Sequence, residues 1–400
     1  MTLRRALLSV AVLLAVALYA AWRILGPVNA PFFPPARDGW EEALQQRITL
    51  PPGWRFTVFA RDLDGPRLMQ FTADGGLLVS GFTSDKLFLL KPDGDGDGRS
   101  DGTDVLTGGW NLPHGLLLEG QTLYVAEETK VTRYIFDGAT LSSPQLIVDG
   151  LPSAGGHRSR TLKRGPDGAL YLSIGSSCNA CVETDPRRAA ILRFKEGEPP
   201  QLYAAGLRNS VGFDWQPGTG ELYAVDNGRD NLGDDHPDDE LNRITAGGHY
   251  GWPFVHGFGI ADPELGTSLP PGVQPIPPVH GFGAHRAPLS IRFLSDGTTL
   301  VNEHGSWNRS VKAGYRIVQL VFHGNAVTEQ TFLTGCEVDG DVICRPVDSL
   351  EAPDRSIYVS DDYAGAIYRL VPPASKQGRM AIFAATQQRF LALLTVSKHL

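Results

Sequence analysis

One short pattern of residues recurs six times along the chain, and it constrains the fold more than any other feature. Each copy opens on a basic or imidazole side chain, enters an apolar segment, passes a turn rich in Gly, Asp and Pro, and returns as a second apolar segment. The second segments cover 77–80, 122–126, 169–174, 221–225, 299–302 and 357–360, and the opening residues are Arg67, His114, His157, Arg208, His285 and Arg345. Repeats of roughly 40–50 residues made of short strands are typical of β-propellers. The sequence therefore predicts an all-β, six-bladed β-propeller over residues 51–371, in which segment 56–60 begins the first blade or pairs with the last blade to close the ring.

The six opening side chains are expected to converge, because the first strand of every propeller blade lines the central channel. Any one of them alone is more simply explained as a solvated loop residue. Six at the same phase of six repeats are harder to explain that way. Clustered cations repel one another, so the pattern predicts a multiply charged anionic ligand at the channel mouth.

The N-terminal residues predict export. Residues 1–25 begin with a basic pair and continue into an apolar run, 6–22, in which only Ser9 is strongly polar. Such a segment is a signal peptide or a retained membrane anchor, and the sequence leaves both open. Either places the rest of the chain in the periplasm or outside the cell, tethered to the inner membrane if the anchor is retained. Residues 26–50 are expected to be a linker with one short helical piece near 39–47, and no role is assigned to the C-terminal tail, 372–400.

Composition narrows the partners and the redox compartment. The formal net charge of −8 argues against a nucleic-acid partner. Cys178 and Cys181 form a CxxC pair without a second pair or a following His, so zinc and c-type haem are disfavoured. In an exported protein a disulfide is the better interpretation, and Cys336 and Cys344 flank a short loop that a second disulfide would close. A redox role for the CxxC pair is the weaker alternative, because no thioredoxin-like pattern surrounds it.

Two acidic stretches are candidate calcium sites. The first matches calcium-loop spacing, with Gly98 at position 6 and carboxylates at positions 1, 3, 5, 9 and 12: Asp93, Asp95, Asp97, Asp101 and Asp104. Its alternative is a hairpin turn rich in Gly and Asp. The second stretch, 226–242, collects carboxylates that repel one another unless a cation is bound, and hard oxygen ligands favour Ca²⁺ over softer metals. Its alternative is a solvated acidic loop.

Several segments together resemble the soluble-type quinoprotein sugar dehydrogenases, most closely the L-sorbosone dehydrogenase-like branch. The resemblance covers about residues 50–371. The segments that carry it are 155–162 (GGHRSRTL), 175–181 (GSSCNAC), 206–212 (GLRNSVG), 226–230 (DNGRD), 238–242 (DDELN), 248–253 (GHYGWP), 304–310 (HGSWNRS) and 358–362 (YVSDD).

The resemblance implies a six-bladed propeller that holds pyrroloquinoline quinone, a tricarboxylate, with Ca²⁺ at the channel mouth. It implies that His157 is the catalytic base, which takes the hydroxyl proton while hydride passes from the substrate carbon to the quinone. The residues that it places at the cofactor are Arg208 and Asn209 at the quinone, Arg345 at a carboxylate, and Arg67, His114 and His285 around it. It places the cofactor's calcium on the main chain of Gly228 and Arg229, and a structural calcium on Glu240, the Tyr250 main chain and Asp262. The classical glucose enzyme has a lysine near the cofactor, where this chain reads Glu303-His304-Gly305-Ser306.

Three functions remain open from the sequence. The first is an exported quinone- and calcium-dependent dehydrogenase that oxidises an aldose or a sorbosone-like aldehyde and passes electrons to a quinone or a cytochrome. The second is a calcium-dependent propeller lactonase, which needs Glu and Asn side chains on a central metal, whereas the channel positions here are mostly Arg and His. The third is a non-catalytic propeller that only binds a ligand.

Overall fold

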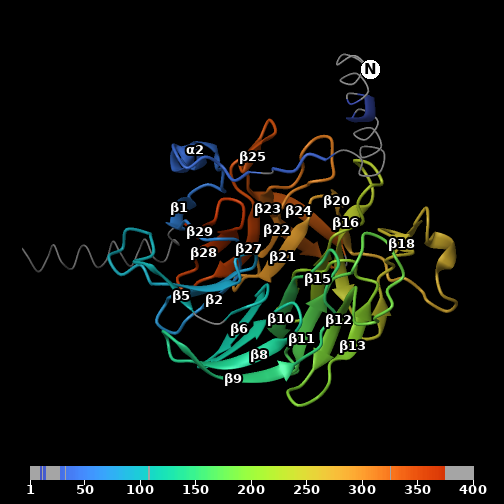
Figure 1. The fold of residues 1–400 in the computed structure, drawn as a ribbon. Coiled ribbons are helices and arrows are strands. Elements are labelled where there is room, and N and C mark those ends of the chain that lie inside the picture. The colour runs from blue at the N-terminus through green and yellow to red at the C-terminus, as the bar shows by residue number, and fades with distance from the viewer. Residues whose placement is uncertain are drawn as a thin grey trace, which may run out of the picture.

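The computed structural model describes residues 10, 12–14, 28–31, 33–106, 109–324 and 326–373. In these residues six large antiparallel sheets stand around a common axis, which confirms the predicted six-bladed propeller (Figure 1). Most of the predicted export segment and residues 374–400 lie outside the described residues. Within the described part, no helix has the length and apolar character needed to cross a membrane.

The first three strands of each blade follow one another in the chain, and the outer strands of some blades come from elsewhere. The first blade contains β2 (Pro66–Phe71), β3 (Leu77–Gly81), β4 (Lys86–Leu90) and β5 (Thr103–Leu106), and the second contains β6 (Gly115–Glu119), β7 (Thr122–Ala126), β8 (Val131–Phe136) and β9 (Leu141–Val148). The third contains β10 (Arg160–Arg164), β11 (Leu170–Ile174), β12 (Ala190–Phe194), β13 (Gln201–Ala205) and the added β17 (Gly248–His249), and the fourth contains β14 (Phe213–Trp215), β15 (Leu222–Asp226), β16 (Asp238–Ile244) and β20 (His280–Ala284). The fifth contains β21 (Pro288–Phe293), β22 (Thr299–Glu303), β23 (Arg316–His323) and β24 (Ala326–Leu333), and the sixth contains β27 (Pro346–Glu351), β28 (Ile357–Asp361), β29 (Ala366–Val371) and β1 (Arg55–Ala60). Outside the blades lie α2 (Trp40–Arg47), the hairpins β18 (Val255–His256)–β19 (Ile260–Ala261) and β25 (Glu337–Val338)–β26 (Asp341–Val342), and the 3₁₀ turn η1 (Gly266–Ser268).

The last blade takes its outer strand from the start of the domain. β1 pairs antiparallel with β29, so that Arg55 faces Val371 and Val58 faces Tyr368. The pairing confirms that segment 56–60 closes the ring, and the first blade therefore begins with β2. Closure by one strand from the other end of the chain ties the first and last blades together and covers an edge that would otherwise be open to aggregation.

The core is a ring of apolar layers between neighbouring blades. One cluster joins β2–β4 of the first blade to β1, Tyr358 and Ile367 of the last blade, and five others fill the remaining interfaces between blades. Strands β3, β11, β15, β22 and β28 are buried along their whole length. Because a buried middle strand contacts blades on both faces, it reads as a continuous apolar run, which is why the second segment of each repeat was recognisable in the sequence.

Within each blade the first and second strands are antiparallel, so the start of the first lies beside the end of the second. Pro288 of β21 pairs with Glu303 of β22, and Pro346 of β27 pairs with Asp361 of β28. Residues just before a first strand and just after a second strand therefore meet at one rim of the propeller. This rim carries the candidate site.

Candidate functional site

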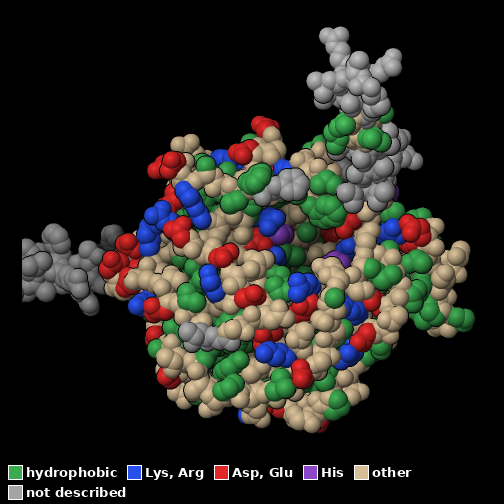
Figure 2. Space-filling view, viewed as in Figure 1, with side chains coloured by type: hydrophobic (Ala, Val, Ile, Leu, Met, Phe, Trp, Pro, Cys, Tyr) green, Lys and Arg blue, Asp and Glu red, His purple; other side chains and the backbone are tan. Residues whose placement is uncertain are grey.

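A cavity of about 400 Å³ opens at this rim. Figure 2 shows histidine and basic side chains around a hollow near the middle of the face. The sequence-predicted residues that line the cavity are Arg67, His157, Arg208, Asn209, Gly228 and His285. They come from four of the six blades, so the repeat brings together residues far apart in the chain.

His157 is held in one orientation by its Nδ1 atom. Nδ1 lies 3.0 Å from the carbonyl oxygen of Ser176 and 2.9 Å from its Oγ. The carbonyl can only accept, and the Ser176 hydroxyl donates to the carbonyl of Cys178 at 2.7 Å, so both contacts call for a proton on Nδ1. That tautomer leaves the lone pair on Nε2, the atom that a general base uses.

The surroundings of His157 keep its imidazole uncharged. Burial, with the nearby Arg208 guanidinium as the next cause, lowers the pKa of His157 from 6.5 to about 3. At neutral pH the ring is therefore a proton acceptor. Gly175 allows this arrangement, because a Cβ there would stand 2.5 Å from the His157 Cβ and 2.6 Å from the Asn209 Oδ1.

Arg208 is buried and held on several sides by the protein. Its Nε donates to the main-chain carbonyl of Asn179 and its Nη2 donates to the Asn179 side-chain oxygen, each at 2.9 Å. Its Nη1 donates to the Asn227 carbonyl at 3.2 Å. Nη2 also binds the Asp230 carboxylate at 2.9 Å. These contacts use four of the five N–H donors of the guanidinium and fix its plane at the cavity wall.

A second group of cations shares one carboxylate. Asp362 lies 2.8 Å from Arg67, 2.9 Å from His304 and 3.0 Å from Arg345. Burial alone would raise the pKa of Asp362, but Arg67, His304 and Arg345 hold it well below its ordinary value. Together with Asp230, this carboxylate offsets much of the positive charge, so repulsion among the cations does not by itself require an external anion, contrary to the argument from sequence.

Two of the predicted cofactor-binding residues are not among those that line the cavity. Arg345 lies beside it, bound to Asp362 and placed over the Tyr363 ring. His114 is fully buried, and its main-chain N–H already pairs with Ala126 at 3.0 Å. Its ring packs edge-on against Phe82, while Nδ1 lies 3.3 Å from the Arg160 carbonyl. In this structure His114 packs in the channel wall and does not line the cavity, so its place at the ligand stays a prediction.

The buried His114 predicts an acid-sensitive contribution to stability. Burial, with Arg67 as the next cause, lowers the pKa of His114 from 6.5 to about 3 in the native state. Between these values the unfolded chain binds a proton that the native state does not, so stability falls as pH falls below 6.5. From pH 7 to pH 5 the loss is about 2 kcal/mol. We expect His114→Gln to lose about 2 kcal/mol less than the native protein over this range, as measured by urea unfolding at both pH values.

The matched control for this experiment is His323→Gln, which changes an exposed histidine at the end of β23. The control should show the same pH dependence as the native protein. An unchanged pH dependence in the His114 variant would show that this side chain does not resist protonation.

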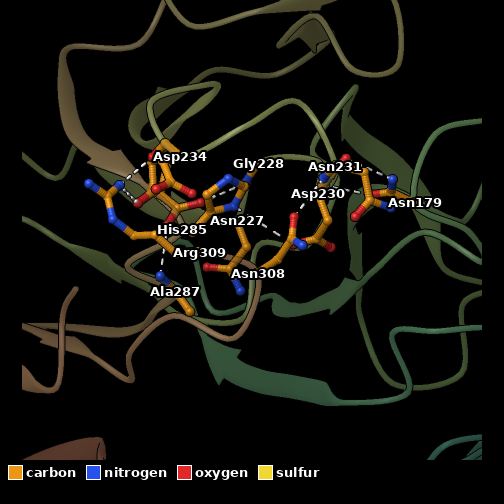
Figure 3. A network of polar contacts seen from close by, with 12 residues as sticks. Asn179, Asn227, Gly228, Asp230, Asn231, Asp234, His285, Ala287, Asn308 and Arg309 are labelled. Atoms are coloured by element: carbon orange, nitrogen blue, oxygen red, sulfur yellow. Dashed lines mark hydrogen bonds and ion pairs between the residues drawn. The ribbon is translucent and has the colours of Figure 1, made fainter. Parts of the chain in front are cut away.

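A loop between β15 and β16 forms the acidic side of the cavity. Gly228 N and Ala287 N donate to the two oxygens of Asp239, each at 2.7 Å, and His285 Nε2 donates to the Gly233 carbonyl at 2.8 Å. Asn231 N donates to Asn308 Oδ1 at 2.7 Å, and Arg309 binds the Asp234 carbonyl. Figure 3 shows this network, with Arg309 at one end and Asn179 at the other. The loop is thus held from the third blade on one side and from the fifth blade on the other.

Several oxygen atoms of this loop could take a cation at the cavity. The Asn227 Oδ1 atom is buried without a hydrogen-bond partner among the described residues, and Asn227, Asp230 and Asp239 all line the cavity. Burial raises the pKa of Asp239 to about 6. Gly228 lines the cavity as well, but Arg229 does not, and its guanidinium binds Asp262 at 2.6 Å and Glu264 at 3.0 Å.

The residues predicted for a structural calcium are only partly brought together. Glu240 and Tyr250 line a small separate cavity of about 10 Å³, with Asp226 in the same wall. Burial, reinforced by Asp226, raises the pKa of Glu240 to about 8. Asp262 lies apart from this cavity because Arg229 and His256 already bind it, at 2.6 and 2.7 Å. The structure does not bring Asp262 together with Glu240 and Tyr250, whereas Asp226, from the same acidic stretch 226–242, lies beside them.

The predicted calcium loop gathers three of its five carboxylates. Asp93, Asp95 and Asp101 place ligand atoms within 4.8 Å of one another. Asp97 accepts the main-chain N–H of Arg99, and Asp104 belongs to β5 and pairs with Lys91 at 3.5 Å. The strand pulls the twelfth position away from the loop, so the five-carboxylate set is wrong. Asp93 is also committed to Arg369 at 3.0 Å.

The sequence reasoning missed several lining residues that end or follow second strands. Asn227 follows β15 and His304 follows β22, and both line the cavity. Asp362 follows β28 and binds Arg67 without lining the cavity itself. The same repeat would have identified them, since these positions share a rim with the start of the first strands. The cysteine predictions are confirmed, because disulfides join Cys178 to Cys181 and Cys336 to Cys344.

The fold and the site define a six-bladed propeller protein with one polar, ligand-sized cavity at the end of its channel. The chain belongs to the TrAA12-like family, whose model matches residues 48–246 and 273–371. It is 37% identical over 219 residues to an uncharacterised protein of Borreliella burgdorferi, a match that covers 50% of this chain and spans only 56% of that relative. It is 27% identical over 318 residues, 64% of this chain and 72% of the relative, to a pyrroloquinoline quinone-dependent sugar dehydrogenase of Hypocrea jecorina.

Among solved structures, the calcium structure of the Trichoderma reesei Carbohydrate-Active Enzymes Family AA12 protein superposes with a TM-score of 0.70 at 24% identity, covering 81% of this chain and 96% of that chain. At that identity the likeness establishes the shared propeller fold. The family assignment supports the broad class that the sequence motifs resemble, while the narrower likeness to the sorbosone branch stays a prediction.

Proposed function

We propose that the protein is a dehydrogenase that uses pyrroloquinoline quinone and Ca²⁺ to oxidise a sugar or a sugar aldehyde. The observation that carries this proposal is an uncharged histidine whose Nε2 is unprotonated, set in a cavity whose wall offers guanidinium, imidazole and amide groups. Membership of the TrAA12-like family and the named activity of the Hypocrea jecorina relative support the same assignment.

The residues of the cavity fit a cofactor that combines an anion with a cation. A volume of about 400 Å³ lies in the usual range for small-molecule sites, about 300–1,000 Å³. Arg67, Arg208 and Asn209 would bind the carboxylate and quinone oxygens, for which charge-assisted hydrogen bonds are well suited. The Asn227 Oδ1 atom, the Asp230 and Asp239 carboxylates and the Gly228 carbonyl would hold the calcium, which prefers oxygen ligands.

His157 would perform the proton transfer. When bound, the quinone accepts the two electrons that the substrate carbon gives up as hydride. His157 Nε2 would take the proton of the hydroxyl on the same carbon, which a sugar aldehyde carries in its hydrated form, and the Ser176 carbonyl would stabilise the imidazolium through the Nδ1–H bond. Trp307, which is 40% exposed and lines the cavity, offers a broad amphipathic face for a sugar ring.

The proposal extends to the sugar, the electron acceptor and the place of action. We propose an aldose or a sorbosone-like aldehyde as substrate, a quinone or a cytochrome as acceptor, and export to the periplasm or the cell exterior, with tethering to the inner membrane if the N-terminal segment is retained.

The test is a titration of the purified full chain with pyrroloquinoline quinone, with Ca²⁺ and after calcium removal by a chelator. We expect saturable binding that needs Ca²⁺, and dye reduction that depends on one or more sugars in a panel of aldoses and sorbosone. Failure to bind the quinone in the presence of Ca²⁺ would overturn the proposal. Lactone hydrolysis in the absence of quinone would instead support the lactonase alternative.

A further inference from the structure

We propose that the disulfide loop Cys178–Cys181 positions the base, the cofactor-binding arginine and the metal-binding loop together, with Asn179 as the main positioning residue. The inference deepens the function proposed above and rests on it for the identity of the ligands. The CxxC pair would then serve as a scaffold of the site, a role that neither zinc binding nor redox catalysis requires. The loop lies between β11 and β12 of the third blade.

Asn179 joins two segments of the fourth blade that the proposed function uses. Its Oδ1 accepts from Arg208 Nη2 at 2.9 Å and from the main-chain N–H of Asp230 at 2.7 Å. Its Nδ2 donates to the Asp230 carbonyl at 3.0 Å. The side chain thus pairs with both main-chain groups of residue 230, as Figure 3 shows, and it holds Arg208 at the same time.

The main chain of the disulfide loop adds further anchors. The Asn179 carbonyl accepts from Arg208 Nε at 2.9 Å and from the Trp252 indole at 3.3 Å. The Cys178 carbonyl accepts from Ser176 Oγ at 2.7 Å, and that hydroxyl oxygen in turn accepts from His157 Nδ1 at 2.9 Å. Two adjacent carbonyls of one small loop therefore orient the arginine and, through Ser176, the histidine.

The disulfide explains how so short a loop can hold these groups. Residues 175–189 form no strand, so regular main-chain hydrogen bonds do not fix their positions. Ordering flexible residues costs roughly 1–2 kcal/mol each in backbone entropy, and a covalent link restricts the alternatives of the open chain. The Glu183 carboxylate also holds this segment, because its two oxygens accept hydrogen bonds from the Ser177 hydroxyl at 2.9 and 3.0 Å.

The experiment compares three variants of the full chain: Asn179→Ala, Cys178→Ser with Cys181→Ser, and Cys336→Ser with Cys344→Ser. The last pair is the matched control, because it removes the other disulfide, which closes the β25–β26 hairpin and whose two residues do not line the cavity. Dissociation constants for pyrroloquinoline quinone and for Ca²⁺ are measured where all variants are folded. Amide hydrogen exchange at residues 230 and 231 is measured without cofactor or metal.

We expect Asn179→Ala and the Cys178/Cys181 variant to weaken quinone binding by about 10–100-fold, in line with the loss of one hydrogen bond to a charged group. Exchange at residue 230 should quicken in both, because its N–H loses the Asn179 acceptor. The control pair should lower thermal stability without changing either readout.

Native affinity in the Cys178/Cys181 variant, or equal weakening in the control, would overturn the inference. If the native protein itself binds no quinone, the proposed function fails, while the exchange at residues 230 and 231 still decides whether the disulfide loop holds the 227–231 segment.

Discussion

Replacing His157 with glutamine is expected to lower kcat by about 10²–10⁴-fold, the usual contribution of a general base. The dissociation constant of pyrroloquinoline quinone should stay close to that of the native protein. Glutamine keeps a polar side chain of similar reach but cannot accept a proton at neutral pH. The Ser176 carbonyl and hydroxyl, which now accept from Nδ1, remain within reach of the new amide N–H.

The separation of the two readouts follows from where the charges lie. His157 is uncharged in the native site, so its loss removes no cation from the cavity. Arg67 and Arg208 carry the positive charge that an anionic cofactor needs. Asp362 holds Arg67 in place, and Asp230 and Asn179 hold Arg208. Among the described residues, none of these three partners makes a hydrogen bond to the His157 imidazole. Transition-state stabilisation should therefore fall while ground-state binding persists.

The measurement is steady-state dye reduction with the preferred sugar, alongside a quinone titration at fixed Ca²⁺. His323→Gln, at an exposed position, is the control and should leave kcat unchanged. Turnover within tenfold of the native rate in the His157 variant would mean that another group takes the proton.

The repeat predicted the propeller because each blade reuses one pattern of buried and turn residues. The second strands β3, β7, β11, β15, β22 and β28 fall within two residues of the segments expected from sequence. Only the middle strands of a blade are covered on both faces, and their continuous apolar runs are visible without any knowledge of the partners. The ring closure was predictable for the complementary reason: one strand preceded the first full repeat.

The direction of each rim side chain was less predictable. His114 directly precedes β6 and its N–H is already hydrogen-bonded to Ala126, whereas His157 stands three residues before β10 in a loop. Successive side chains on a strand point to opposite faces, so a shift of one residue decides between the cavity and the packed wall. A pattern of residue types does not resolve that shift.

The acidic partners were missed for a different reason. Asp362 and Asp230 become partners of Arg67 and Arg208 only when the ring closes or a loop folds back. Likewise, Arg229 takes Asp262 out of the predicted calcium site through a contact between distant segments. Such pairings depend on three-dimensional neighbours, which the spacing of carboxylates along the chain does not report.

Replacing Arg208 with lysine is expected to weaken quinone binding by about 10–150-fold, the equivalent of one hydrogen bond to a charged group at about 1.5–3 kcal/mol. Lysine keeps the positive charge but has three donors on one atom, whereas Arg208 now spans Asn179, Asn227 and Asp230 with a planar fork. An ammonium group that satisfies Asp230 cannot also reach the Asn227 carbonyl and the cavity in the same geometry.

Thermal stability should also fall, because the variant leaves buried acceptors on Asn179 and Asn227 without their present donor, at roughly 1–3 kcal/mol for each group that water does not reach.

The matched control is Arg243→Lys, which changes a guanidinium in the same blade that pairs with Glu221 at 3.2 Å on the outer surface. Exposed pairs of this kind contribute about 0–1 kcal/mol, so the control should alter neither quinone affinity nor stability appreciably. Quinone titration and thermal unfolding in the presence and absence of cofactor distinguish the two effects. A loss of stability with native quinone affinity would mean that Arg208 only supports the structure of the site. The positive charge that faces the cofactor would then have to come from Arg67 in the first blade.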